Sequence, residues 1–156
     1  MLTDFDNFWH ATSRINLTTS KLQKVQNCLA RVVLQRRKFC HAQPLLKSLH
    51  WLPISQRIKF KLATLAFKIQ FTSQPEYLRQ LISSQQPGSS MTLRSSTRPL
   101  LQAPRTRTAY GSRAFGSAVP AIWNNLPTSV IEANSLPAFR RRLKTHLFTV
   151  AFENSG

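Results

Sequence analysis

Acidic residues are scarce in this chain. Of its 156 residues only 5 are Asp or Glu, against 22 Lys or Arg, which gives a formal net charge of +17 at pH 7. Two-metal phosphoryl transfer needs converging carboxylates, and a catalytic triad needs an acid that orients its base. Asp4 and Asp6 lack the flanking strand–turn–strand pattern of a polymerase site, and the other acids are Glu76, Glu132 and Glu153. We therefore predict that the protein is not an enzyme.

Cysteine is also scarce, and the chain has no glycine-rich phosphate-binding loop. Two cysteines do not make a disulfide framework, so Cys28 and Cys40 are expected to be free, small apolar residues in a reducing compartment. With His41 and His50 they make four potential zinc ligands, but their spacing matches no zinc-binding pattern. His146 is expected to pack at the edge of a helix. We predict no metal, no cofactor and no small-molecule substrate.

Long apolar runs are absent. No run approaches the roughly 20 residues that span a bilayer, and the segment Met1–Asp6 holds no apolar core of a signal peptide. The sequence also shows no internal repeat with the period of a solenoid. These absences predict an intracellular protein, nuclear or cytoplasmic, without a membrane span.

Positive charge is abundant and is spread along the chain. From Lys21 to the end there are 21 basic residues and 3 acidic ones, so the charge belongs to the folded part and not to a tail. Such a field attracts polyanions. Nucleic acid is the commonest polyanionic partner, and an acidic membrane surface is the second. Because the basic residues recur on several elements and not on one amphipathic helix, we expect nucleic acid and no membrane partner.

The stretch Leu49–Pro53 and the helix that follows it organise the chain. Pro53 is suited to a helix start, and Ile54–Phe71 then carries apolar residues with helical periodicity on two nearly opposite faces. One face holds five aliphatic residues and the other holds three phenylalanines, so this central helix is expected to be sandwiched. Arg57, Lys61 and Lys68, which we call the basic strip, lie between the two faces and are expected to reach solvent through a groove.

A second long helix is predicted at Ser20–Lys38. Its apolar residues share one face and are expected to pack inward, whereas basic residues recur every seven positions on the opposite side. The helix has no interleaved acids, although exposed helices usually alternate the two signs. The apolar face consists of Leu22, Val25, Leu29, Val32 and Val33, and the basic side consists of Lys24, Arg31 and Lys38.

Shorter helices complete a mostly α fold, a single helical domain around the central helix at about 54–71. Trp51 and Trp123 each precede a turn beside Leu and Pro, so they are expected to anchor the core and not to stack on bases. The predicted helices are Pro44–His50, Pro75–Ile82, Arg113–Asn125 with a kink or restart at Pro120, and Ser135–Ala151. The expected parts are 1–19, helical 20–82, a connector 83–112, helical 113–151 and a tail 152–156.

The connector at about 83–112 is rich in Ser, Thr, Gln, Pro and Arg. Extended chain is expected there, with or without one small β-hairpin that pairs Arg98–Ala103 with Thr106–Tyr110. Disorder over Gln85–Thr97 is the alternative. Arg105 and Arg107 have no acidic neighbour, so they are candidates to line the same groove as the basic strip.

Seven segments, in this order and spacing, resemble one known family. They include the stretch LHWLP within Leu46–Lys61 and PAIWNNLP at Pro120–Pro127. The set resembles the C-terminal end of the reverse-transcriptase polyprotein of LINE-type, non-LTR retrotransposons, with the Jockey-like group closest in appearance. The resemblance covers about Ser20 to Phe148. The other segments are Leu22–Arg31, Leu93–Ser96, Pro104–Arg107, Gly111–Phe115 and Phe139–Phe148.

The resemblance implies a thumb and the tail that follows it, which in that family are thought to hold template and primer. The family's paired catalytic aspartates lie upstream, in the palm, and its apurinic-type endonuclease is a separate domain; neither is found in this sequence. The resemblance therefore implies a truncated or exapted remnant without the catalytic palm.

The function that we expect is non-catalytic binding of RNA or DNA through the phosphate backbone, with low sequence specificity. Two alternatives remain: a protein–protein interaction module that uses apolar surface, and a retroelement fragment with no host role. The candidate nucleic-acid-binding residues are Arg57, Lys61, Lys68, Arg105, Arg107, Lys24, Arg31, Lys38, Arg140, Arg141, Arg142 and Lys144.

Overall fold

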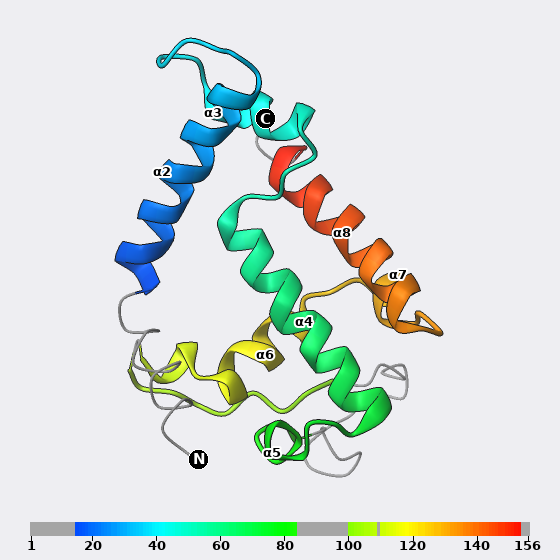
Figure 1. Cartoon of the computed structure of the whole chain (residues 1–156). Helices are drawn as coiled ribbons and strands as arrows, with labels where there is room; N and C mark the ends of the chain where they lie inside the picture. Colours follow the sequence, from blue (N-terminus) through cyan, green and yellow to red (C-terminus); the bar gives the residue numbers. More distant parts are fainter. Residues whose placement is uncertain (1–14, 84–99, 109, 154–156) are drawn as a thin grey trace. The chain divides into compact units, whose positions relative to one another are not determined.

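The computed structural model describes residues 15–83, 100–108 and 110–153, and the mostly α fold is confirmed (Figure 1). Helices dominate these residues, which contain no extended strand. The elements in chain order are α2 (Ile15–Val33), α3 (Ala42–Ser48), α4 (Ile54–Thr72), α5 (Glu76–Arg79), the 3₁₀ turn η1 (Gly111–Arg113), α6 (Phe115–Asn124), α7 (Thr128–Ile131) and α8 (Leu136–Phe152).

The chain divides into two compact units. One consists of Met1–Ile58 and Lys144–Gly156, and the other of Lys59–Leu143. The first unit therefore holds α2, α3, the first turn of α4 and the C-terminal half of α8. The second holds the rest of α4 and α8, together with α5, η1, α6 and α7.

In the first unit, a residue in the left-handed conformation follows the last turn of α2 and of α3. Gln35 has φ 49°, and the N–H of Arg36 donates to the carbonyl of Arg31 at 2.8 Å, which is the closing bond of a Schellman motif. At the end of α3, His50 has φ 54° and Trp51 N–H donates to Leu46 O at 2.9 Å. The helix predicted to reach Lys38 therefore ends at Val33, and it begins at Ile15 and not at Ser20.

A chain of side-chain amides holds α2 against the start of α4. The Nε2 of Gln26, a residue that is only 6% exposed, donates to Leu52 O at 2.9 Å. Gln23 Oε1 accepts from the N–H of Ile54 at 2.9 Å, and its Nε2 donates to Gln26 Oε1 and to Asn27 Oδ1. Ile54 is the first residue of α4, where backbone N–H groups have no partner within the helix. Gln23 therefore caps α4 from a neighbouring helix.

The side of α2 that faces the protein is thus polar or small, and the predicted inward packing of its apolar face is wrong. Gln26 and Ala30 are buried, with Ala30 at 0% exposure. The amide hydrogen bonds select this orientation, which turns the apolar side outward. The exposed apolar side chains are Leu22 at 48%, Val25 at 55%, Leu29 at 51%, Val32 at 73% and Val33 at 55%.

The rings of α4, α6 and α8 stack in the core of the second unit. Phe67 lies 4.2 Å from Phe139 between ring centroids, and Trp123 lies 6.0 Å from Phe139. All three side chains are exposed by 1% or less, which confirms the prediction that Trp123 is a core anchor. Leu143 and Val119 are also fully buried. The aromatic stack therefore joins three helices that lie far apart in sequence.

The central helix has its predicted bounds to within one residue, but it is not a sandwich. Its buried residues are Ala63, Ala66, Phe67 and Ile69, which form one broad face. Leu65 and Phe71, each expected on an apolar face, are 37% and 60% exposed.

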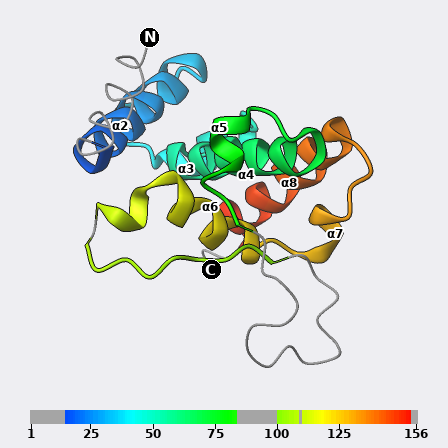
Figure 2. The ribbon, with the colours of Figure 1, turned by 90° about the horizontal axis from the view of Figure 1, so that it is seen from below.

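The expected β-hairpin is not formed in residues 100–108, which run as extended chain (Figure 2). The side chain of Asn124, at the end of α6, pairs with the backbone of Leu101. Its Oδ1 accepts from Leu101 N–H at 3.0 Å, and its Nδ2 donates to Leu101 O at 2.9 Å. Leu101 is buried, and residues 102–108 are exposed. The predictions for Arg98 and for Gln85–Thr97 lie outside the described residues.

Two further features of the second unit differ from the prediction or refine it. The helix α6 continues through Pro120, and its Gly116 lies so close to the segment after α5 that an added Cβ would be 2.9 Å from Leu81 O. The short helix α7, for which the sequence analysis made no prediction, has Val130 and Ile131 buried. Four residues are too few for a periodic pattern, so α7 could not be identified from the sequence.

Loss of the Gln26 amide should destabilise the first unit. Gln26→Ala removes the donor to the Leu52 carbonyl and leaves Gln23 with one partner fewer, so the free energy of unfolding should fall by about 1–3 kcal/mol. Urea denaturation followed by circular dichroism measures the change. Gln70→Ala, at an exposed position of α4, is the control and should change stability by less than about 0.5 kcal/mol. Equal effects of the two substitutions would mean that the amide network is dispensable.

Candidate nucleic-acid interface

Basic side chains cover the described surface. Of the Lys and Arg residues that the structure describes, only Arg31 and Arg113 are half-buried, and all the others are exposed. The three long helices α2, α4 and α8 contain no Asp or Glu at all. Most exposed helices offset their cations with acids three or four positions away. None of these three helices offsets its cations with an acid of its own.

The basic strip lies on the exposed side of α4. Arg57 and Lys61 are one turn apart, and Lys68 follows two turns later on the same side; all three are exposed. Because Leu65 and Phe71 beside them are also exposed, the strip lies on a wide face and not at the bottom of a narrow groove. Lys59, which the sequence analysis did not select, is a further exposed cation of α4.

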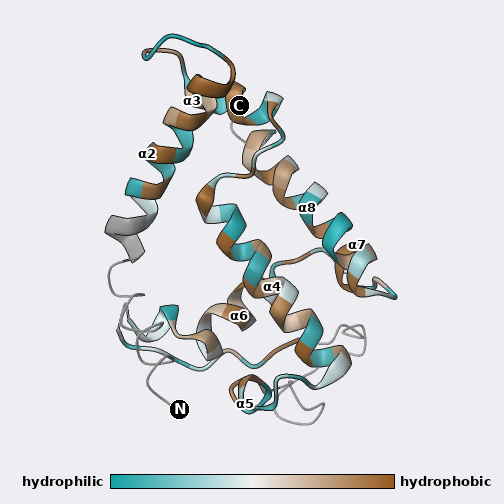
Figure 3. Ribbon diagram, in the orientation of Figure 1, coloured by the Kyte–Doolittle hydropathy of each residue, from teal (hydrophilic) through white to brown (hydrophobic). Residues whose placement is uncertain are grey.

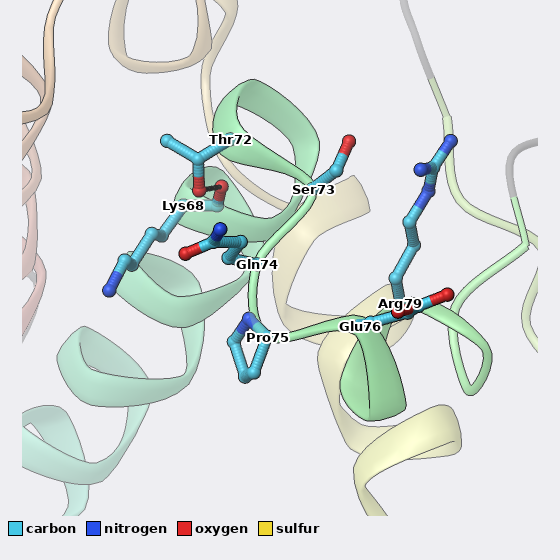
Figure 4. Close-up of a pocket in the computed structure, with 7 residues that line it drawn as sticks. All are labelled: Lys68, Thr72, Ser73, Gln74, Pro75, Glu76 and Arg79. Carbon is cyan, nitrogen blue, oxygen red and sulfur yellow. Dashed lines mark hydrogen bonds between the residues drawn. The ribbon is translucent and has the colours of Figure 1, made fainter.

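An open pocket of about 690 Å³ lies where α4 ends and α5 begins (Figure 4). Lys68 and Arg79 line it on the two sides of the turn Ser73–Pro75, and Glu76 also lines it. Their side chains extend in different directions in Figure 4, and the hydroxyl of Thr72 already donates to Lys68 O at 2.7 Å. The two cations do not converge on one point, so the pocket does not form a site for a single anion.

The second group of predicted residues lies on α8. Arg140, Arg141, Arg142 and Lys144 are all exposed, and Arg140 and Lys144 are one turn apart. Arg142 has a structural contact as well, because its Nη1 donates to Ser129 O at 2.8 Å and so connects α8 to α7. The α8 cluster therefore combines exposed charge with one arginine that holds a neighbouring helix.

The third group, Lys24, Arg31 and Lys38, does not form the basic side predicted for the helix Ser20–Lys38. Lys24 is exposed on α2, but Lys38 lies in the turn after the helix, because the Schellman motif ends α2 at Val33. Arg31 is half-buried, and its Nε donates to Cys40 O at 3.0 Å. Arg31 thus holds the turn against the helix. Arg36 and Arg37, which the sequence analysis did not select, are exposed next to Lys38 and could have been found from the run of three cations.

Arg105 and Arg107 are both exposed on the extended chain after Leu101. Their expected place beside the basic strip stays a prediction. Trp51 is half-buried and follows His50, whose ring stacks on Phe148 of α8 at 5.6 Å between centroids.

Other classes of site are not formed by the described residues. No group of three or more His, Cys, Asp and Glu residues within 15–83, 100–108 and 110–153 is placed to hold a metal ion. Cys28 is exposed, Cys40 is half-buried, and neither is in a disulfide. Among these same residues, no helix combines the length and the apolar character that a membrane span requires.

Comparisons with protein-family models, with curated proteins and with solved structures found no match to this chain.

Substitution of Arg140 and of Arg142 should distinguish the effect of a lost charge on stability from the effect of a lost hydrogen bond. Arg142→Ala removes the hydrogen bond to Ser129 O and should lower the free energy of unfolding by about 0.5–1.5 kcal/mol. Arg140→Ala removes the same charge from the same helix and should leave stability nearly unchanged. Thermal denaturation of the two variants side by side makes the comparison. If Arg140→Ala destabilised the protein as much as Arg142→Ala, the contact to α7 would not be what distinguishes them.

Proposed function

We propose that this protein binds nucleic acid through the phosphate backbone, without catalysis and with little sequence preference. One observation carries the proposal: α4 and α8 present cations one turn apart on exposed faces, Arg57 with Lys61 and Arg140 with Lys144, and neither helix contains an acid. Like charges at this spacing destabilise a helix by a few tenths of a kcal/mol per pair. A phosphate beside each pair turns that repulsion into attraction and releases bound counterions.

The arrangement favours contact with the backbone over readout of bases. The cations lie on convex helix faces and on the extended chain at Arg105 and Arg107. Trp123 is buried in the core and lies out of reach of a base, whereas an exposed aromatic ring such as Phe71 can stack on any base without reading its identity. Phosphate contacts position a ligand but carry no sequence information.

The resemblance to the thumb and tail of a non-LTR retrotransposon reverse transcriptase points to the same function. We infer that the chain descends from such an element and retains its nucleic-acid-holding part. The resemblance rests on the ordered segments from Leu22 to Phe148 and assigns no catalytic residue.

A protein–protein interaction module is the second candidate. It is favoured by the outward apolar side of α2, where five aliphatic residues are exposed by about half or more. Contiguous exposed apolar surface of this kind marks interaction sites in soluble proteins. The two functions use different surfaces and are compatible.

Binding should depend strongly on salt. If about six phosphates are neutralised, log K for a generic RNA or DNA duplex should fall against log salt concentration with a slope near −5. Fluorescence anisotropy with labelled duplexes of unrelated sequence, from low to physiological salt, measures the slope and the sequence preference. A flat salt response, or no binding at low salt, would refute the nucleic-acid proposal.

The basic strip should contribute more than the cations of α2. Arg57→Ala with Lys61→Ala should weaken binding more than Lys21→Ala with Lys24→Ala, because the strip has a third cation, Lys68, on the same face. Each double substitution removes two charges and should reduce the salt slope by at most about 2. Melting temperatures should hardly change, since exposed charges contribute little to stability.

The α2 pair is the matched control because Lys21 and Lys24 are exposed, whereas Arg31 holds Cys40 O and its loss would disturb the turn. If both double variants bind alike, the positive field is diffuse and the strip has no special role. If the Arg57/Lys61 variant unfolds, the stems of those side chains pack against the protein and the strip is not a free contact surface.

A further inference from the structure

The exposed side of α2 has the spacing of a coiled-coil seam. Leu22, Val25, Leu29 and Val32, which we call the apolar seam, follow one another at intervals of three, four and three residues. This is the alternation of a and d positions in a heptad repeat. Their exposed fractions run from 48% to 73%, and hydrophobic residues recur along this helix in Figure 3. A seam of this kind normally faces another helix.

The outward direction of the seam is set by hydrogen bonds on the other side of the helix. Turning the seam inward would break the bonds from Gln26 to Leu52 O and from Ile54 N–H to Gln23. It would also leave the N-terminus of α4 without its cap. The apolar seam is thus held away from its own unit by the same network that anchors α2.

The charges around the seam decide what kind of helix fits it. Lys21 is exposed on α2 beside the seam, and Arg36, Arg37 and Lys38 are exposed just beyond its C-terminal end. The helix contains no acidic residue. A second copy of the chain would bring the same cations, and a net charge of +17, against themselves. A helix with acidic residues next to its own apolar stripe would pair with these cations.

We propose that α2 is a docking site for an acidic amphipathic helix of a partner protein. The partner places leucine-like side chains at a and d positions against the apolar seam, and Glu or Asp at the flanking positions toward Lys21 and the cations beyond the end of α2. α2 has 19 residues and is about 28 Å long, which matches a partner of about three heptads. This surface is separate from the basic strip, so the proposal does not depend on nucleic-acid binding.

The probe is a labelled 21-residue peptide of three heptads with Leu at a and d positions and Glu at e and g positions. A second peptide has Lys in place of every Glu, and a third keeps the Glu residues but has Gln in place of every Leu. Anisotropy at physiological salt measures their binding to the full chain, and sedimentation measures self-association of the chain. The test variant is Val25→Ser with Leu29→Ser. Its matched control is Leu65→Ser with Leu81→Ser, which removes partly exposed aliphatic side chains outside the first unit.

The Leu/Glu peptide should bind the wild-type chain and the Leu65/Leu81 control, and its Kd should rise at least tenfold for the Val25/Leu29 variant. The Leu/Lys and Gln/Glu peptides should bind at least tenfold more weakly than the Leu/Glu peptide. The Val25/Leu29 variant should keep wild-type affinity for duplex nucleic acid and a near wild-type melting temperature, since both side chains are half exposed.

Three results would overturn the proposal. Equal binding of the Leu/Glu and Gln/Glu peptides would mean that charge alone attracts them to the basic surface. A wild-type dimer that becomes monomeric in the Val25/Leu29 variant would assign the seam to a second copy. Failure to bind the Leu/Glu peptide, with binding to vesicles of anionic lipid that the same variant loses, would assign the seam to a membrane surface.

Discussion

The hydrogen bonds from Gln23 and Gln26 to the segment Leu52–Ile54 are the interaction on which the arrangement of the first unit depends. Two buried or half-buried amides satisfy the Leu52 carbonyl and the first N–H of α4, groups that would otherwise be orphaned at a helix start. An unpaired buried polar group costs about 1–3 kcal/mol. Polar satisfaction therefore decides which side of α2 packs, and the apolar side is left for another molecule.

Electrostatic repulsion acts at longer range than these hydrogen bonds, and it destabilises the folded chain. A net charge of +17 opposes compaction, and the long helices have no acids that would relieve it locally. The aromatic stack of Phe67, Phe139 and Trp123 and the rest of the buried core supply the opposing stabilisation in the second unit. The positive charge that destabilises the folded state also attracts phosphates to the surface. The function that we propose and the unusual composition are thus two consequences of one property.

The long helices were predictable where hydrophobic periodicity and packing agree. In α8, Phe139, Leu143 and Leu147 recur at helical spacing and are all buried, and in α4 the start after Pro53 was identified correctly. The sequence did not predict the hydrogen bonds that join a side chain to the backbone of a distant segment. Asn124 pairs with both backbone groups of Leu101, and Gln23 accepts a hydrogen bond from the first N–H of α4. No local pattern shows such contacts, because the two partners are 23 and 31 residues apart.

The sequence by itself determined the mostly α class, the bounds of α4 and α8, the excess of positive charge and the candidate cations, because each depends on composition or on local periodicity. Only the tertiary structure decided which of those cations are free and which are committed. Arg31 donates a hydrogen bond to Cys40 O and Arg142 donates one to Ser129 O, whereas Arg57 and Lys61 are exposed. It also decided that α2 faces outward. Periodicity identifies a helix's apolar side, but the direction of that side depends on hydrogen-bond partners distant in the chain.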